Sequence, residues 1–267
     1  MHEIAMDGYL YSKPDSAFYF SKLQYEFAES VNNKKWMADA LITQGVSFYI
    51  KSNYAKAIDY YAKSLKIYKE LEDQKSIAIS LNNIGVIYET QGDYTKAIDY
   101  YTKSLKVYEL VGDKKGIANS LNNIGSIHGN QGDYFKAIDD YTKSLKVYEL
   151  VGDKKGIANT LNCIGIIYNN KGDYAKAIDY YTKSLKIVEE LGDKSGIART
   201  LNNIGIVYVR QCDYPKAIEY STRSLKIKEE MGDKRGIAST LNNIGNIYYK
   251  QGDYTKALEY YTKSLKI

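Results

Sequence analysis

The chain has 267 residues, 44% of them apolar and 26% charged, with a formal net charge of +5 at pH 7. Two cysteines cannot cross-link a scaffold of this size, two histidines leave little for a metal cluster, and no apolar run reaches the ~20 residues that span a bilayer. These counts exclude a disulfide-rich secreted protein, a zinc module and a membrane span. The first seven residues contain two acids, Glu3 and Asp7, where a signal peptide has basic residues, so we expect a cytoplasmic protein.

An internal repeat with a period of 40 residues organises most of the chain. A leucine recurs without a shift of register, and a glycine follows it four residues later each time; the leucines are Leu41, Leu81, Leu121, Leu161, Leu201 and Leu241. Gly-Asp pairs such as Gly92-Asp93 and Gly112-Asp113 set a second rhythm of 20 residues. Glycine accepts the left-handed conformation that ends a helix, and aspartate caps the start of the next. Each period is therefore predicted to be a helical hairpin, with apolar residues at helical spacing.

In chain order, a degenerate hairpin comes first. Residues 1–36 align with the repeat only weakly, for example through Ala17, and are expected to cap the first end of the array, since stacked repeats need caps. Six repeats follow in residues 37–267, as hairpins at about 37–71, 77–111, 117–151, 157–191, 197–231 and 237–267. The two prolines, Pro14 and Pro215, fall in the first turn of a second helix, where a missing N–H costs nothing. The sixth repeat is truncated at Ile267 and is expected to be uncapped, so that the chain either continues in a longer protein or stacks on another copy.

The residues of one period resemble the tetratricopeptide repeat. The pattern is Leu81-x-x-Ile84-Gly85-x-x-Tyr88, then Gly92-Asp93-Tyr94, then Ala97-Ile98-x-x-Tyr101-x-x-Ser104-Leu105, and it recurs six times. The period exceeds the family's usual ~34 residues and is similar to that of Pins-type adaptors, kinesin light chains and bacterial regulatory proteins. The resemblance implies an all-α, right-handed superhelical solenoid of antiparallel helical hairpins. It also implies that Gly85 and Ala97 let the two helices approach each other around Tyr101.

The resemblance further implies a concave groove lined by the first helix of each hairpin. There the first asparagine of each Leu-Asn-Asn is expected to form a ladder of amides that can pair with the backbone of an extended peptide; these residues are Asn82, Asn122, Asn162, Asn202 and Asn242. The second asparagine resembles the family's structural residue, which bonds between neighbouring helices, and Cys163 replaces it once. A ladder copied by duplication without a function is the alternative.

Other predicted groove positions differ between repeats, and we expect selectivity there. Val46 and Tyr49 make the first end apolar, whereas the far end is basic and polar, with Arg199, Arg210, Asn246, Tyr249 and Lys250. Arginine and lysine on a concave wall recognise carboxylates, and a cleft strengthens their field. We therefore expect an extended or partly helical protein ligand with apolar anchors at one end and acidic residues at the other. The alternative is that these positions differ through neutral drift, because they lie on a solvent-exposed surface without a ligand.

Nucleic-acid binding is disfavoured by the pairing of the charges. In each of the six repeats one basic side chain of the second helix follows an acid by four residues, as Lys103 follows Asp99, and such pairs support an exposed helix. The second helices lie on the convex side in the resembling family, which leaves no basic stripe for phosphates.

Catalysis is also disfavoured. His128 stands where other repeats have tyrosine and is interpreted as a core substitute, although the spacing does not decide whether it meets Asp140. Cys212 takes the place of a helix-ending glycine, and neither Cys163 nor Cys212 has a histidine nearby in the sequence to activate it.

The sequence therefore predicts a protein–protein interaction scaffold without enzymatic activity, cofactor or metal. It would bind a peptide segment in its groove, alone or as the sensor or adaptor part of a longer regulatory protein. The alternative is a self-assembling structural element that stacks through its open C-terminal end.

Overall fold

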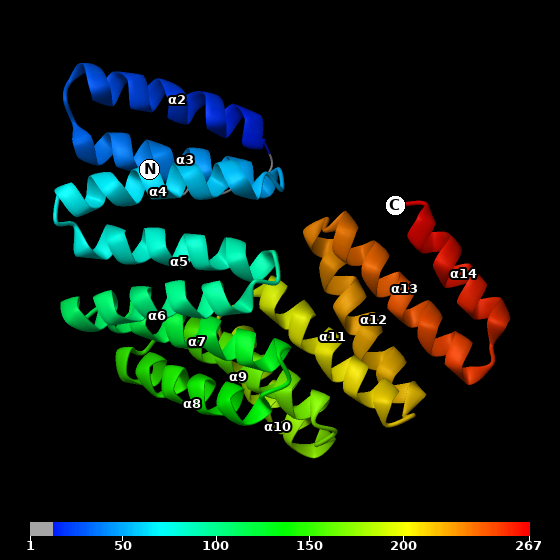
Figure 1. Cartoon of the computed structure of the whole chain (residues 1–267). Coiled ribbons are helices and arrows are strands. Elements are labelled where there is room, and N and C mark those ends of the chain that lie inside the picture. The colour runs from blue at the N-terminus through cyan, green and yellow to red at the C-terminus, as the bar shows by residue number, and fades with distance from the viewer. Residues whose placement is uncertain (1–12) are drawn as a thin grey trace. The chain divides into compact units, whose positions relative to one another are not determined.

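The computed structural model describes residues 13–267, and all the regular secondary structure in that range is helical (Figure 1). The helices are α2 (Pro14–Ser30), α3 (Lys34–Ile50), α4 (Tyr54–Glu70), α5 (Gln74–Thr90), α6 (Tyr94–Val111), α7 (Lys114–Asn130), α8 (Tyr134–Val151), α9 (Lys154–Asn170), α10 (Tyr174–Glu190), α11 (Lys194–Arg210), α12 (Tyr214–Met231), α13 (Lys234–Gln251) and α14 (Tyr254–Leu265). The predicted all-α class and the 20-residue rhythm of helices are confirmed. The chain divides into two compact units at Ile127, within α7.

Most helix boundaries follow from the capping residues that the sequence supplies, whereas α2 begins without a side-chain capping hydrogen bond. The carboxylate of Asp93 accepts a hydrogen bond from the backbone N–H of Lys96 at 3.1 Å, and the same arrangement opens most other helices. Asn33 and Asn53 take this role at α3 and α4. The first helices begin three residues before the predicted hairpin starts, because the cap residue lies directly before them.

The helix ends confirm the prediction of left-handed residues. Gly92 has a φ of 78°, and the other glycines of the Gly-Asp pairs share this conformation. Cys212 takes it as well, with a φ of 60°. Both prolines lie in a first turn, Pro14 at the start of α2 and Pro215 near the start of α12.

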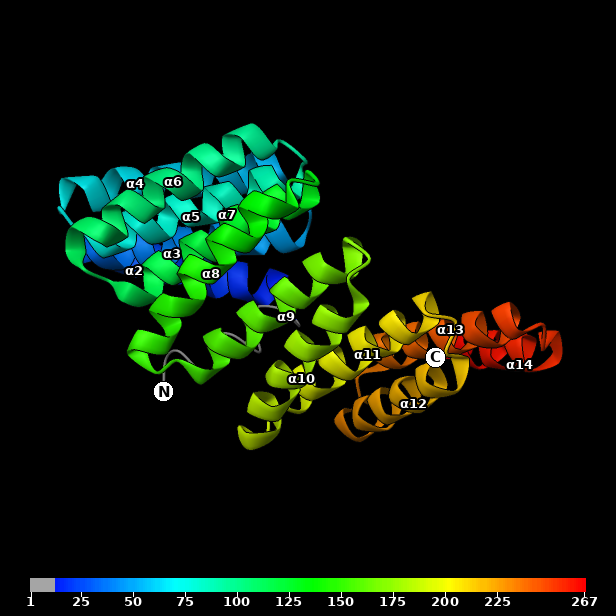
Figure 2. The same ribbon diagram turned by 90° about the horizontal axis from the view of Figure 1, so that it is seen from below.

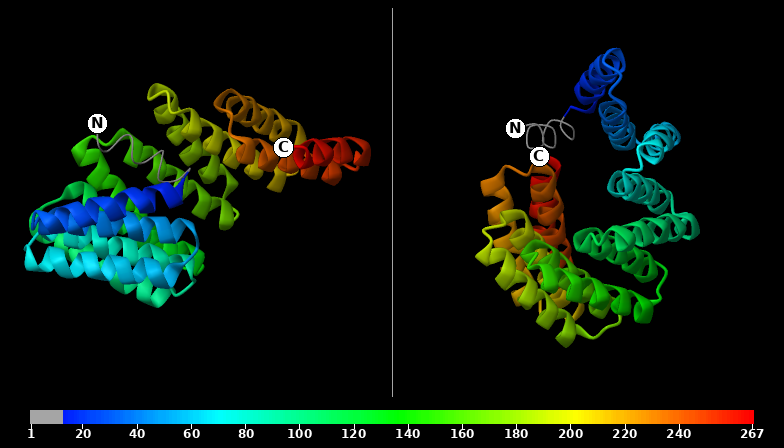
Figure 3. Two further views of the ribbon diagram at one scale, coloured as in Figure 1. Left: turned by 90° about the horizontal axis from the view of Figure 1, so that it is seen from above. Right: turned by 90° about the vertical axis from the view of Figure 1, so that its left-hand side faces the viewer.

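In the first unit, α2 to α6 and most of α7 follow one another as antiparallel neighbours (Figure 1; Figure 3, right). The ring of Tyr101 is fully buried against Gly85, where an added Cβ would lie 2.7 Å from the ring. Ala97, Ile124 and Ile127 complete this part of the core. Glycine at position 85 is therefore what lets α5 and α6 approach each other.

In the second unit, the hairpins α9/α10, α11/α12 and α13/α14 lie in succession after α8 (Figure 2). The hydroxyl of Ser184 on α10 donates to the carbonyl of Ala158 on α9 at 2.8 Å. The same bond joins Ser224 to Ala198 and Ser264 to Ala238. Serine, where the resembling motif often has alanine, thus ties the two helices of a hairpin together.

Two of the predictions concern the ends of the array: a cap formed by residues 1–36 and an uncovered last helix. Residues 1–12, which include the first helix of the predicted cap, lie outside the described range, and the domain boundaries remain a prediction. On α14, Leu258 is 68% exposed and Leu265 is 88% exposed. The corresponding residues of α12, Ile218 and Leu225, are half-buried.

Candidate functional site: a groove on the second unit

The asparagine ladder forms hydrogen bonds between successive first helices. Asn123 donates through Nδ2 to Oδ1 of Asn82 at 2.9 Å, and Asn243 donates to Asn202 at 3.3 Å. Asn123, Asn203 and Asn243 therefore have the inter-helix role that the resemblance implied for the second asparagine. Each accepting ladder residue uses one lone pair of its oxygen in this bond, and the amide N–H groups of Asn82 and Asn202 point to no protein acceptor within the described chain.

Asn162 differs from the other ladder residues. It is only 3% exposed, its oxygen accepts from Asn203 at 2.8 Å, and its Nδ2 donates to Oγ1 of Thr200 at 3.2 Å. Since both ends of the amide are engaged and buried, we do not include Asn162 in the proposed site. Asn242 is exposed and Asn122 half-buried.

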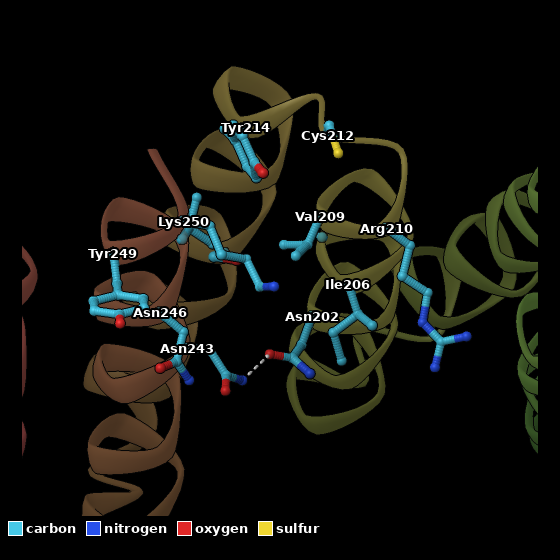
Figure 4. Close-up of a pocket in the computed structure, with 13 residues that line it drawn as sticks. Asn202, Ile206, Val209, Arg210, Cys212, Tyr214, Asn243, Asn246, Tyr249 and Lys250 are labelled. Atoms are coloured by element: carbon cyan, nitrogen blue, oxygen red, sulfur yellow. Dashed lines mark hydrogen bonds between the residues drawn. The ribbon is translucent and has the colours of Figure 1, made fainter. Parts of the chain in front are cut away.

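Five of the predicted ligand contacts line one pocket of the second unit, between α11 and α13 (Figure 4). They are Asn202, Arg210, Asn246, Tyr249 and Lys250. The pocket has a volume of about 610 Å³, within the range of ligand sites in proteins. Its apolar wall consists of Ile206, Val209 and Ile247. These five predicted residues thus lie together at one pocket, and their role in binding remains a prediction.

The cations of this region are placed differently from one another. Lys250 points into the space between α11 and α13, whereas the guanidinium of Arg210 is turned away from it (Figure 4). Arg210 donates through Nη1 to the carbonyl of Asn169 at 2.9 Å, and Arg199 donates to Oδ1 of Asn159 at 2.5 Å. The two arginines therefore connect α11 to α9. Each keeps further N–H donors for a ligand, because a guanidinium has five.

Lys250 has no ion-pair partner within residues 13–267, and the residues that line the pocket include no carboxylate. An anionic group in the pocket would therefore be the partner of the Lys250 ammonium. This is the geometry that the predicted acid-binding end of the groove requires.

Ser221 is a lining residue that sequence reasoning missed. The other five repeats have a tyrosine at this position of the second helix, namely Tyr61, Tyr101, Tyr141, Tyr181 and Tyr261. The serine at this position, where the other repeats have tyrosine, is the sequence feature that could have predicted the pocket. Cys212 and Tyr214 also line the pocket and were not predicted to do so.

The predicted apolar contacts belong to the first unit. Val46 is half-buried and packs against a cluster that includes Ala57 and Tyr61. The hydroxyl of Tyr49 lies 3.4 Å from Oγ1 of Thr90. Their side chains thus contribute to the packing of the first unit, and their role in binding remains a prediction.

His128 and Asp140 do meet. Nδ1 of His128 lies 2.7 Å from Oδ2 of Asp140, and both side chains are largely buried. In the other described repeats the same two positions hold stacked rings, as in Tyr168 and Tyr180 with centroids 5.4 Å apart. Burial raises the pKa of Asp140, against the opposing effect of the hydrogen bond from His128. The hydrogen-bonded pair of His128 and Asp140 thus takes the place of the stacked aromatic rings of the other repeats.

The described residues contain no cluster of three or more histidine, cysteine or acidic side chains that could ligate a metal ion. Burial raises the pKa of the Cys163 thiol. Among helices α2 to α14, none is long and apolar enough to cross a membrane.

The fold is shared with known repeat proteins. BtubC (BKLC) from P. vanneervenii is 19% identical with a TM-score of 0.71, over 82% of this chain and 92% of that chain. Aspartyl phosphate phosphatase F from Bacillus subtilis is 18% identical with a TM-score of 0.75, over 97% and 67%. A Rap protein complexed with Competence and Sporulation Factor is 16% identical with a TM-score of 0.68, over 88% and 74%. At these identities the likeness shows the fold alone.

No curated protein matches the sequence. Family models described as "Tetratricopeptide repeat" match residues 36–110, 117–151, 156–230 and 238–267. One of these models alone matches more than half of the chain, in two segments. The chain therefore belongs to the tetratricopeptide repeat family.

Proposed function

We infer that this chain holds a peptide segment of another protein in the groove between α11 and α13. Tetratricopeptide repeats are protein-interaction scaffolds, and the chain belongs to that family. The observation that supports this site most strongly is the unpaired ammonium of Lys250, which faces an apolar wall and a set of amides. Such a pocket, mostly apolar with a few polar groups, is typical of ligand sites.

The ligand that fits is an extended or partly helical segment with an acidic residue beside an apolar one. A carboxylate would pair with Lys250, and Arg210 and, outside the pocket lining, Arg199 would add positive potential from α11. Asn202 and Asn246 offer amide groups to the peptide backbone, each bond being worth about 1 kcal/mol net. Asn242 is proposed to extend recognition within the second unit. Asn82, Asn122, Val46 and Tyr49 are proposed as ligand contacts on the first unit. The Rap protein of similar fold is complexed with Competence and Sporulation Factor. The role suits an interaction module, or the sensor or adaptor part of a regulatory protein.

A random peptide library displayed on phage, selected on the immobilised chain, tests this function. We expect enriched sequences to contain aspartate or glutamate and to bind the Lys250→Glu variant at least tenfold more weakly. Lys256→Glu, which changes the same charge at an exposed lysine of α14 that does not line the pocket, is the matched control and should bind normally. Failure to enrich any peptide, or equal binding to Lys250→Glu, would contradict the proposal.

Self-association through α14 is a second candidate function. It is supported by the exposed Leu258 and Leu265, whose counterparts on α12 are half-buried. Light scattering at increasing concentration should then show a dimer or larger species, and Leu258→Lys should abolish it. A monomer at every concentration would exclude this candidate.

A further inference from the structure

The pocket lies where one of the six repeats lacks the tyrosine that the other five have in the second helix. In four described hairpins a tyrosine ring packs on the glycine of the first helix, so closely that an added Cβ would lie 2.4 to 2.7 Å from it; the pairs are Gly45–Tyr61, Gly85–Tyr101, Gly165–Tyr181 and Gly245–Tyr261. In the fifth repeat Ser221 takes the place of the tyrosine, and a Cβ added at Gly205 would lie 2.9 Å from its Oγ. In the other repeats the backbone leaves room for the phenol ring of a tyrosine at this position. In the fifth repeat the same room holds only the two heavy atoms of the Ser221 side chain.

The hairpin α5/α6 shows where the missing phenol would lie. The hydroxyl of Tyr101 donates to Oε2 of Glu89 at 2.7 Å, and Oε1 of Glu89 accepts from Ser126 at 3.0 Å. Three periods further along the chain, the counterparts of Gly85, Glu89 and Ser126 are Gly205, Val209 and Asn246. All three, together with Ser221, line the pocket. The pocket therefore occupies the place that the side chain of Tyr101 fills in the repeat three periods earlier.

The polar groups at the pocket favour a phenol over a plain benzene ring. Asn246 accepts the hydroxyl of Tyr261 through Oδ1 at 2.7 Å, and its Nδ2 has no partner within the described residues. Lys250 points toward the same space (Figure 4). A phenol oxygen could accept from either group, while Ile206 and Val209 contact the ring.

We propose that this pocket recognises a tyrosine side chain of the bound peptide, with the ring inserted against Gly205 and Ser221. The proposal deepens the proposed function, on which it rests, by naming the residue that anchors the ligand. Buried aromatic anchors carry much of the affinity of protein interfaces. The acidic residue that pairs with Lys250 would then lie beside this tyrosine in the peptide.

The test uses 4-methylphenol, which is the tyrosine side chain alone, observed by saturation-transfer NMR. We expect it to bind the wild type and to bind the Ser221→Tyr variant at least tenfold more weakly, because that variant fills the pocket with the residue of the other repeats. Ser221→Ala keeps the space open and should still bind. Toluene should bind more weakly than 4-methylphenol. Equal binding of 4-methylphenol to the wild type and to Ser221→Tyr, or no binding to the wild type, would overturn the proposal.

Two further variants keep the test decisive. Tyr181→Ser should open a second hole beside Gly165, and 4-methylphenol should then raise the Tm of this variant more than that of the wild type. Ser221→Phe fills the original pocket in a second way if Ser221→Tyr does not fold.

The peptides selected from the library separate the two proposals. Loss of binding to Ser221→Tyr, with tyrosine enriched beside an acid, supports the tyrosine site. Peptides that bind Ser221→Tyr with unchanged affinity but fail to bind Lys250→Glu would leave the proposed function standing and overturn the tyrosine site. If no peptide is enriched, the proposed function fails, while 4-methylphenol still reports on the pocket itself.

Discussion

At the scale of single residues, departures from the repeat show which contacts matter, because five or six copies of the same environment serve as internal references. Cys212 adopts the left-handed conformation that glycine has at the equivalent positions 92, 132, 172 and 252. A side chain there crowds the backbone, whereas glycine adopts this conformation freely.

Cys212→Gly is therefore expected to raise the free energy of unfolding by up to ~1 kcal/mol. Urea denaturation at equilibrium measures the change. Cys212→Ala keeps the strained backbone and should give no gain, so an equal gain in both variants would show that the cysteine side chain, and not its backbone, is unfavourable.

The pair of His128 and Asp140 supplies a second test at this scale. Replacing both by tyrosine restores the stacked rings of the other repeats, and such aromatic pairs contribute about 0.5–1.5 kcal/mol beyond their buried area. We expect the double variant to be more stable than the wild type, and Asp140→Ala alone to be less stable because it leaves His128 without its partner. A double variant no more stable than the wild type would contradict this account of the pair.

The same pair predicts a pH dependence. Because burial raises the pKa of Asp140, the folded state holds this proton more tightly than the unfolded state. The contribution of Asp140 to stability is therefore complete below the ordinary carboxyl pKa of ~3.9 and falls as the pH rises above it. The tyrosine variant should lack this fall when unfolding is measured between about pH 3 and 7.

At the scale of the helix, the charge of the capping aspartates makes the stability of the protein depend on pH. The pKa of Asp93 is lowered by its bond to the Lys96 ammonium and by the backbone N–H of Lys96, and Asp173 is lowered in the same way by Lys176. A carboxyl whose pKa is lowered by folding stabilises the protein above its unfolded pKa, and the stabilisation is lost as the pH falls.

Asp93→Asn combined with Asp173→Asn should therefore make the acid limb of a stability–pH profile shallower below about pH 4, since asparagine caps a helix without titrating. The chain already uses asparagine in this way at Asn53, whose Oδ1 accepts from the N–H of Lys56. Thermal unfolding followed by circular dichroism measures the effect. An unchanged acid limb would indicate that the caps contribute nothing through their charge.

The helices could be predicted from the sequence because their causes are local. Spacing, capping aspartates and left-handed glycines act within one turn, so the elements and even the strained position of Cys212 were predicted. The site was predicted less well, since its details depend on neighbouring repeats. The burial of Asn162 between Thr200 and Asn203 and the bond from Arg210 to α9 arise between hairpins. Predicting the pocket at Ser221 would have required comparing the residue at this one position in all six repeats.

At the scale of the whole molecule, each helix is stabilised mainly by its sequence neighbours, as in other repeat arrays. Within the second unit, α11 contacts α9, α10 and α12, whereas α14 packs on α13. We expect amide hydrogen exchange to be fastest in α14 and slowest in α11 among the helices of this unit. Protection of α14 equal to that of α11 would contradict a nearest-neighbour description.

The central claim is that the groove between α11 and α13 receives the peptide, and its most direct test uses the exposed thiol of Cys212, which lines the pocket. Cys163 makes a suitable internal reference, because burial raises the pKa of its thiol and so lowers its reactivity. The rate of Cys212 alkylation by iodoacetamide should fall severalfold when a library-selected peptide saturates the chain, and should recover in the Lys250→Glu variant at the same peptide concentration. An unchanged rate at saturation would place the peptide elsewhere on the molecule.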